Sequence, residues 1–209
     1  MSSQATIRDD PSLLSRGDRL LFQLESALNF LGGGVILLLV FFATANILGR
    51  WLFNLPINGY VDWIEQAMAF MAFLGLAYTH RLGGHIRMDI FIGHLRRRPL
   101  WLAEFTSTLL MFALTLVLIY GAYLHFLRAY HIGDSSLDIE LPTWPAKLMV
   151  PVALTVLALR LLLHLWAYLR AFLKGEDEPV AVPLIEDAAT LAAKEAESVM
   201  EDALRERSP

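Results

Sequence analysis

One uncharged stretch constrains the fold of this chain more than any other feature. No charged residue lies between Glu25 and Arg50, and residues 26–49 are mostly Leu, Phe, Val, Ala and Gly. As a helix rising about 1.5 Å per residue, this stretch is about 36 Å long, which is enough to cross a hydrocarbon core of about 30 Å with some tilt. Three further apolar runs follow, at about 61–80, 105–127 and 147–169. The sequence therefore predicts an all-α integral membrane protein with four transmembrane helices, in a membrane domain over residues 26–173.

The two ends of the chain differ from this membrane domain. Within residues 1–25, apolar residues and one glycine recur at helical spacing, with charged residues between them: Leu13, Leu14, Gly17, Leu20, Leu21 and Leu24. The pattern favours an amphipathic helix at the membrane surface, and a cytosolic start to the first span is the alternative. Residues 176–209 hold ten acids and three bases, although the net charge of the whole chain is only −4. We interpret residues 174–209 as an acidic cytoplasmic tail.

Lys and Arg gather on one side of the predicted spans. Three arginines precede the first span, five lie between the second and third spans, and Arg170 and Lys174 follow the fourth. The other two loops are poor in basic residues. Because basic residues concentrate in cytoplasmic loops, we predict that both termini are cytoplasmic and that residues 54–60 and 130–144 face the other side.

The chain lacks the usual marks of an enzyme or of a self-contained carrier. It has no cysteine, and we find no nucleophile motif, phosphate-binding loop, metal-ligand cluster or internal repeat. Carriers with their own transport site usually show repeats or broken helices near the membrane midplane. A self-sufficient four-helix exporter working as a dimer is an alternative, but it needs a buried acid, and the first and third predicted spans contain none. These residues favour a non-enzymatic scaffold beside a larger membrane partner.

Polar residues at the ends of the first two spans need partners. Asn46 and Arg50 end the first span, and Asp62 and Glu65 begin the second, so the two pairs lie at the same end of adjacent antiparallel helices. We predict an ion pair between Arg50 and Glu65 that fixes the geometry of the two helices, since separating a lipid-shielded pair leaves an ion unsatisfied. The alternative interpretation makes Glu65 a proton or cation site.

Two polar residues of the fourth span are harder to explain. Arg160 lies deeper than the span end, and we expect it either to extend to the cytoplasmic headgroups or to contact a partner protein or lipid, as does His164. His80 and His164 are also the one histidine pair that facing helices offer at similar depth. They support the alternative function, a four-helix membrane redox protein with haem b.

Three short motifs point to a family. They are Asn-Ile-Leu-Gly-Arg-Trp-Leu-Phe-Asn-Leu-Pro at 46–56, Gly-His-Ile-Arg-Met-Asp at 84–89, and Ser-Leu-Asp-Ile-Glu-Leu-Pro-Thr-Trp-Pro at 136–145. In this order, and with Glu65 between the first two, the chain resembles the small permease subunit (DctQ type) of tripartite ATP-independent periplasmic (TRAP) transporters. The resemblance covers roughly residues 20–173.

The resemblance implies a multi-pass protein of the bacterial inner membrane with both termini in the cytoplasm. Its implied partners are a large multi-span permease subunit (DctM type), a periplasmic substrate-binding protein (DctP type) and membrane lipids, with no nucleic acid. The implied process is sodium-coupled uptake of an organic acid anion such as a C4-dicarboxylate. Sodium and substrate are expected on the large subunit, so no cofactor is expected here, and the small subunit stands as a fixed scaffold.

The resemblance also carries over individual positions, to which we assign assembly roles rather than substrate binding: Asn46, Arg50, Glu65, His85, Asp89, Pro142 and Trp144. The chain departs from the family pattern in the second span. Gln66 stands where a second acid is frequent, and Phe70 and Phe73 stand where a Trp is frequent. The local packing of this span is therefore expected to differ from that of other members.

Overall fold

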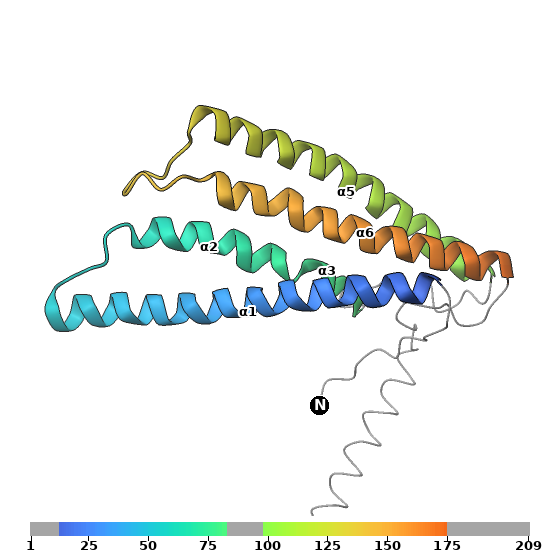
Figure 1. The fold of residues 1–209 in the computed structure, drawn as a ribbon, viewed down its shortest axis with the longest axis horizontal. Helices are drawn as coiled ribbons and strands as arrows, with labels where there is room; N and C mark the ends of the chain where they lie inside the picture. The colour runs from blue at the N-terminus through green and yellow to red at the C-terminus, as the bar shows by residue number, and fades with distance from the viewer. Residues whose placement is uncertain (1–12, 83–97, 175–209) are drawn as a thin grey trace, which may run out of the picture.

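The computed structural model describes residues 13–82 and 98–174, which form five helices (Figure 1). These are α1 (Leu13–Phe53), α2 (Tyr60–Leu74), α3 (Leu76–Arg81), α5 (Arg98–Ile132) and α6 (Trp144–Lys174). Within the described ranges no strand is present, and an isolated bridge joins Ser135 to Pro142. The predicted all-α class is confirmed for this part of the chain.

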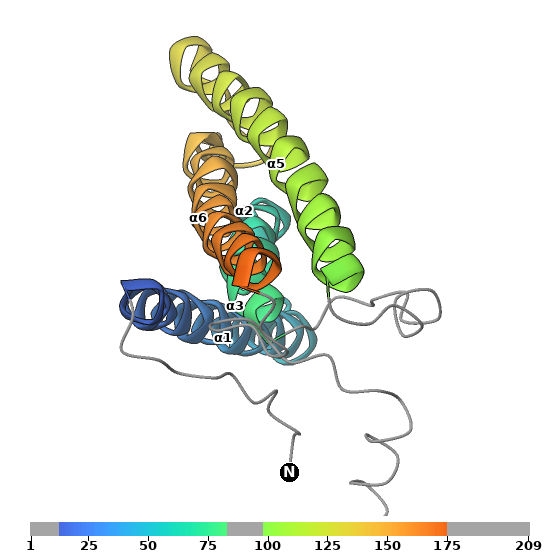
Figure 2. The same cartoon turned by 90° about the vertical axis from the view of Figure 1, so that its right-hand side faces the viewer.

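The helices pack as two antiparallel hairpins, α1 with α2 and α5 with α6. Figure 1 shows them in the order α1, α2, α6, α5, and Figure 2 shows α5 running at an angle to α6. Helix α5 packs mainly against α6. The loops 54–59 and 133–143 lie together at one end, which we name the hairpin end. The start of α1 and the end of α6 lie at the opposite end, which we name the terminal end.

Helix α1 runs without a break through the predicted boundary at Glu25. It is 41 residues long, which corresponds to about 60 Å. The structure therefore joins residues 13–25 and the first span in one helix instead of separating them, and whether these residues lie at the membrane surface or make a cytosolic start to the span stays a prediction. Leu14, Asp18 and Glu25 recur on one stripe of α1 and are buried. This stripe packs against α6, so the first turns of α1 are part of the contact between these two helices.

The predicted second span is divided into two helices. Helix α2 has 15 residues, or about 22 Å, and ends at Leu74; Gly75 follows it, and α3 then adds six residues. At Gly75 an added Cβ would lie 3.1 Å from Oδ1 of Asn29, so the small residue allows α1 to approach the break closely. Helices α1, α5 and α6 are each long and apolar enough to cross a membrane, whereas neither α2 nor α3 alone is.

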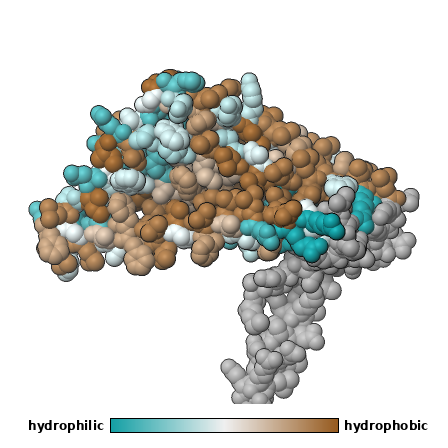
Figure 3. Space-filling view, viewed as in Figure 1, coloured by the Kyte–Doolittle hydropathy of each residue, from teal (hydrophilic) through white to brown (hydrophobic). Residues whose placement is uncertain are grey.

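Helix α6 forms the centre of the fold. The most apolar 18-residue stretch of α6 is 56% buried, whereas the corresponding stretches of α1 and α5 are each 11% buried. Leu154, Leu157 and Leu161 of α6 pack in one buried cluster with Ala77 of α3. Helices α1 and α5 flank this centre and expose large apolar side chains, and the face in Figure 3 is mostly hydrophobic, with hydrophilic residues near the two ends. An open arrangement of this kind suits lipid or protein neighbours rather than water.

Candidate functional site

A buried ionic cluster joins three helices in the terminal half of the fold. We name the side chains of Asp18, Glu25, Arg81 and Arg160 the ionic cluster. The Arg160 side chain is completely buried, and its Nε and Nη2 atoms donate to Oε1 and Oε2 of Glu25 at 2.7 and 2.6 Å. Its Nη1 atom donates to Oδ1 of Asp18. This two-point contact uses the planar guanidinium fully, which a lysine cannot do.

Arg81 completes the cluster from α3. Its Nη2 atom lies 2.8 Å from Oδ2 of Asp18, and its guanidinium carbon lies 3.9 Å from the centre of the Phe22 ring. Asp18 is thus shared by two arginines, and the four charges sum to zero. The cluster ties α1 to both α3 and α6, and removing any one member leaves an uncompensated charge in an apolar environment.

The position of Arg160 corrects the sequence-based expectation. The side chain neither extends to headgroups nor faces a partner protein or lipid, because it is 0% exposed and paired within the chain. The acids that bind Arg160 were not predicted, because Asp18 and Glu25 were assigned to a surface helix. A signal was available, since the two acids are seven residues apart and share a helical stripe with Leu14 and Leu21.

His164 is also buried within the chain rather than facing lipid or a partner. Its ring lies 5.1 Å from the ring of His80, centre to centre, with 32° between the planes, and 6.3 Å from the ring of Tyr168. The two imidazoles therefore pack on each other directly. Axial haem ligands face each other across a porphyrin, so this geometry does not support the haem alternative.

A second polar cluster holds the hairpin end together. The Asp62 side chain of α2 accepts hydrogen bonds from Oγ of Ser136 at 2.6 Å and from the backbone amides of Asp138 and Ile139 at 3.2 and 3.0 Å. Asp62 is only 5% exposed. We name this contact the Asp62 staple, because one carboxylate fixes the loop 133–143 against α2.

Further contacts brace the same end. Nε2 of Gln66 donates to the carbonyl of Pro142 at 3.1 Å, which gives a role to the residue that departs from the family pattern. Nζ of Lys147 lies 2.8 Å from Oδ2 of Asp134, and this ammonium holds the pKa of the Asp134 carboxyl below its usual value. Oδ1 of Asn46 accepts from the Ile57 amide at 2.9 Å, closing the turn between α1 and α2.

The other predicted assembly residues are placed differently from one another. Arg50 and Glu65 are both exposed, and no ion pair joins them in the part of the chain that the structure describes. Pro142 contributes its carbonyl to Gln66, and Trp144 packs edge-on against Tyr130 at 5.9 Å. His85 and Asp89 lie outside the described residues. The predicted Arg50–Glu65 pair is therefore not formed, and the assembly roles of these residues stay predictions.

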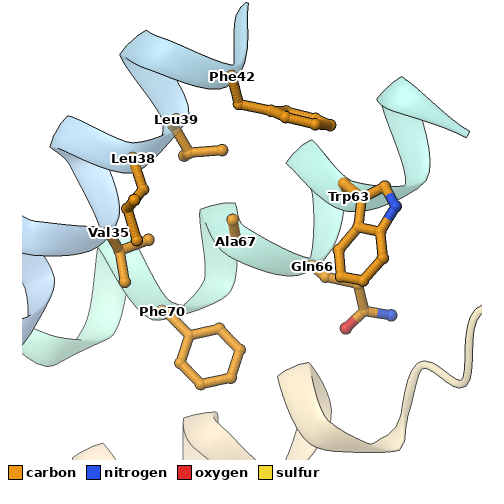
Figure 4. A pocket seen from close by; sticks show the side chains of 8 residues that line it. All are labelled: Val35, Leu38, Leu39, Phe42, Trp63, Gln66, Ala67 and Phe70. Atoms are coloured by element: carbon orange, nitrogen blue, oxygen red, sulfur yellow. The ribbon is translucent and has the colours of Figure 1, made fainter. Parts of the chain in front are cut away.

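An apolar groove runs between α1 and α2 near the hairpin end. It encloses about 470 Å³ and is lined from both helices (Figure 4) by Val35, Leu38, Leu39, Phe42, Trp63, Gln66, Ala67 and Phe70. Among the residues that the structure describes, no group of three or more His, Asp or Glu side chains is placed to hold a metal ion. The described part of the fold thus offers polar clusters that fix helices and an apolar groove that faces outward.

Comparison with known proteins agrees with these observations. Residues 39–171, well over half of the chain, match the model of the family described as tripartite ATP-independent periplasmic transporters, DctQ component. The match includes Arg81, Arg160 and the Asp62 staple, whereas Asp18 and Glu25 precede it. No curated protein matches the chain.

Proposed function

The chain belongs to the DctQ family of TRAP transporter components, and from this premise we propose that it is a fixed scaffold subunit that does not itself carry substrate. The observation that supports this role is the ionic cluster, in which Arg160 is buried and bound by two carboxylates of α1. Moving α1 relative to α6 would separate these charges in an apolar environment, which costs several kcal/mol. A helix set fixed in this way suits a static partner of a moving carrier.

The proposed topology has four membrane passes in the bacterial inner membrane, with α2 and α3 together forming the second pass. Residues 60–81 of these two helices reach about 33 Å in total, enough for a hydrocarbon core of about 30 Å. Both termini are cytoplasmic, following the distribution of basic residues. The hairpin end, with loop 133–143, then faces the periplasm.

The proposed partners follow from the family and from the exposed faces of the fold. A large multi-span permease subunit binds and moves sodium and an organic acid anion, while a periplasmic binding protein delivers that anion. Support for a membrane partner comes from α1 and α5, which leave many large apolar side chains exposed, among them Phe41, Leu110 and Val117. Glu65 is exposed near the hairpin end and is the acid that we assign to the contact with the large subunit.

Co-purification tests the proposed role. The chain is expressed with the large subunit of its transporter, extracted in mild detergent, and compared with Glu65→Gln and with the exposed-loop control Glu140→Gln. We expect Glu65→Gln to reduce the yield of the complex while the substrate affinity of the complex that remains is unchanged. A normal yield with an altered substrate affinity would contradict the assembly role. Full uptake by the large subunit without this chain would contradict the scaffold role itself.

A further inference from the structure

A polar hollow adjoins the apolar groove at the hairpin end of α1 and α2. Two neighbouring pockets, each of about 520 Å³, share the side chains of Asn46, Arg50 and Tyr60. Trp51 lines one of them, and Asp138 lines the other. The stacked rings of Phe42 and Tyr60, 5.5 Å apart, stand between this polar hollow and the apolar groove. The two regions therefore follow one another along the same pair of helices.

The polar hollow is rich in hydrogen-bond donors. Arg50 is exposed and has no ion pair among the described residues. Within the described chain, Oδ1 of Asn46 is engaged by Ile57, whereas the amide nitrogen of Asn46 and the hydroxyl of Tyr60 take part in no hydrogen bond. A guanidinium, an amide and a phenol that face one hollow are complementary to an anionic oxygen acceptor. The exposed Asp138 carboxylate is the one acid in the lining, and it belongs to the loop rather than to α1 or α2.

The groove that continues from this hollow is lined almost entirely by apolar side chains. On α1, Arg50, Asn46, Phe42, Leu39 and Val35 share one stripe that faces α2, and the distance from Arg50 to Val35 is about 22 Å along the helix. One leaflet of a bilayer, which is half of a hydrocarbon core of about 30 Å together with a headgroup layer, has a similar thickness. The stripe therefore has the length of one lipid molecule. Trp51 and Trp63 are exposed beside the hollow and the groove, as interfacial tryptophans are.

We propose that this seam between α1 and α2 binds a phospholipid, with the phosphodiester at Arg50, Asn46 and Tyr60 and an acyl chain in the groove past Phe42. Charge complementarity selects the occupant, because a phospholipid supplies both the acyl chain that fits the groove and the anion that Arg50 lacks among the described residues. The lipid fills the groove between α1 and α2 beside the Phe42–Tyr60 contact. This assignment requires only that the chain lie in a membrane, and it stands or falls separately from the scaffold role.

Lipid retention by the purified full chain tests the proposal. The chain alone is reconstituted in nanodiscs of phosphatidylglycerol and phosphatidylcholine, transferred to detergent, and analysed by native mass spectrometry for retained lipid. We expect a stoichiometric phospholipid on the wild type. Arg50→Gln should lower its retention about fivefold, and Ala67→Phe, which fills the groove, should lower it as well. Arg128→Gln, another exposed arginine towards the hairpin end of α5, is the matched control and should retain lipid as the wild type does.

Several outcomes would overturn the proposal. Equal retention by the wild type, Arg50→Gln and Ala67→Phe would show that the lipid is not held in this seam. Binding of soluble glycerol 3-phosphate with no retained lipid would show an anion site without an acyl chain. Crosslinks that place a helix of the large subunit in the groove of the lipid-free complex would show a protein occupant. If Ala67→Phe does not fold, Leu39→Phe fills the same groove from α1 and gives the same test.

Discussion

The two polar clusters stabilise the two ends of the fold in different ways. The ionic cluster contains two arginines and two acids, all at least largely buried, and its charges cancel. The Asp62 staple contains one carboxylate, and its donors are a hydroxyl and two backbone amides. Removing one member of a buried ion pair destabilises the fold strongly, because the other charge stays buried without a partner. Removing one neutral donor from a carboxylate costs only a single hydrogen bond. Helices α1 and α6 are therefore held together by charge balance, and the loop 133–143 is held by hydrogen bonds.

Arg160→Leu should have the largest effect, because it leaves Asp18 and Glu25 buried with only Arg81 to compensate them. We expect a loss of about 3–5 kcal/mol in stability, measured as a fall in thermal unfolding temperature in detergent. The double variant Arg160→Leu, Glu25→Leu should recover much of that loss, since it removes one buried pair together and leaves Asp18 paired with Arg81. If the double variant were as unstable as the single one, charge balance would not be the reason for the cluster.

Asp62→Asn should have a smaller effect, localised to the hairpin end. The asparagine amide oxygen can still accept a hydrogen bond, but it lacks the negative charge that strengthens the three hydrogen bonds from Ser136, Asp138 and Ile139. We therefore expect a loss of about 1–3 kcal/mol in stability. Limited proteolysis should show faster cleavage in loop 133–143, and Asp138→Asn, whose side chain is exposed, serves as the control. Unchanged loop protection in Asp62→Asn would mean that the staple contributes little to holding this loop.

Gly59→Ala tests whether close packing of Gly59 against Ile139 holds loops 54–59 and 133–143 together, in addition to the Asp62 staple. Gly59 has φ of +68°, and an added Cβ would lie 2.5 Å from Cγ2 of Ile139. We expect a loss of about 1–2 kcal/mol from the left-handed backbone alone, with a further loss from the clash. The double variant Gly59→Ala, Ile139→Ala should recover the part due to the clash. Equal unfolding temperatures for the single and double variants would show that the contact with Ile139 is not limiting.

The partly exposed pair of Lys147 and Asp134 should matter least, and its contribution to stability should depend on pH. The folded-state pKa of Asp134 lies below its ordinary value of 3.8, chiefly because Lys147 bonds its carboxylate. The pair therefore contributes its full stabilisation above that value and loses it as the pH falls through the lower folded pKa. Lys147→Met should lower the unfolding temperature slightly at neutral pH and not at all at strongly acidic pH. A difference that persists in acid would point to lost packing of the lysine stem instead.

Much of the fold followed from patterns within single segments. The long apolar runs predicted the helices, and three of the predicted spans coincide with helices able to cross a membrane, α1, α5 and α6. The motifs at 46–56, 84–89 and 136–145 together indicated the family, which the match over residues 39–171 confirms. These predictions succeeded because helix formation and hydrophobic burial in a membrane depend on local composition and period.

The pairing of polar residues was predicted less well. Arg50 and Glu65 were expected to pair because they end adjacent helices, yet both are exposed, and Asp62 in the same turn is the buried acid. Residues three apart on a helix share a broad face and differ by only about 60° around its axis, so a small rotation of the helix decides which of the two acids faces a neighbour. The interruption at Gly75 was likewise not visible, because a single glycine is compatible with a continuous helix.

The sequence by itself determined that this chain is helical and suited to a membrane, and that it belongs to the DctQ family. These properties depend on apolar runs and short motifs within single segments of the chain. The tertiary structure alone decided that Arg160 meets two carboxylates more than 130 residues away in sequence, and that α1 begins within the packed fold. The physical reason is that a buried charge selects its partner by distance and by exclusion of solvent. Both depend on how whole helices rotate and cross, and on no residue's immediate neighbours.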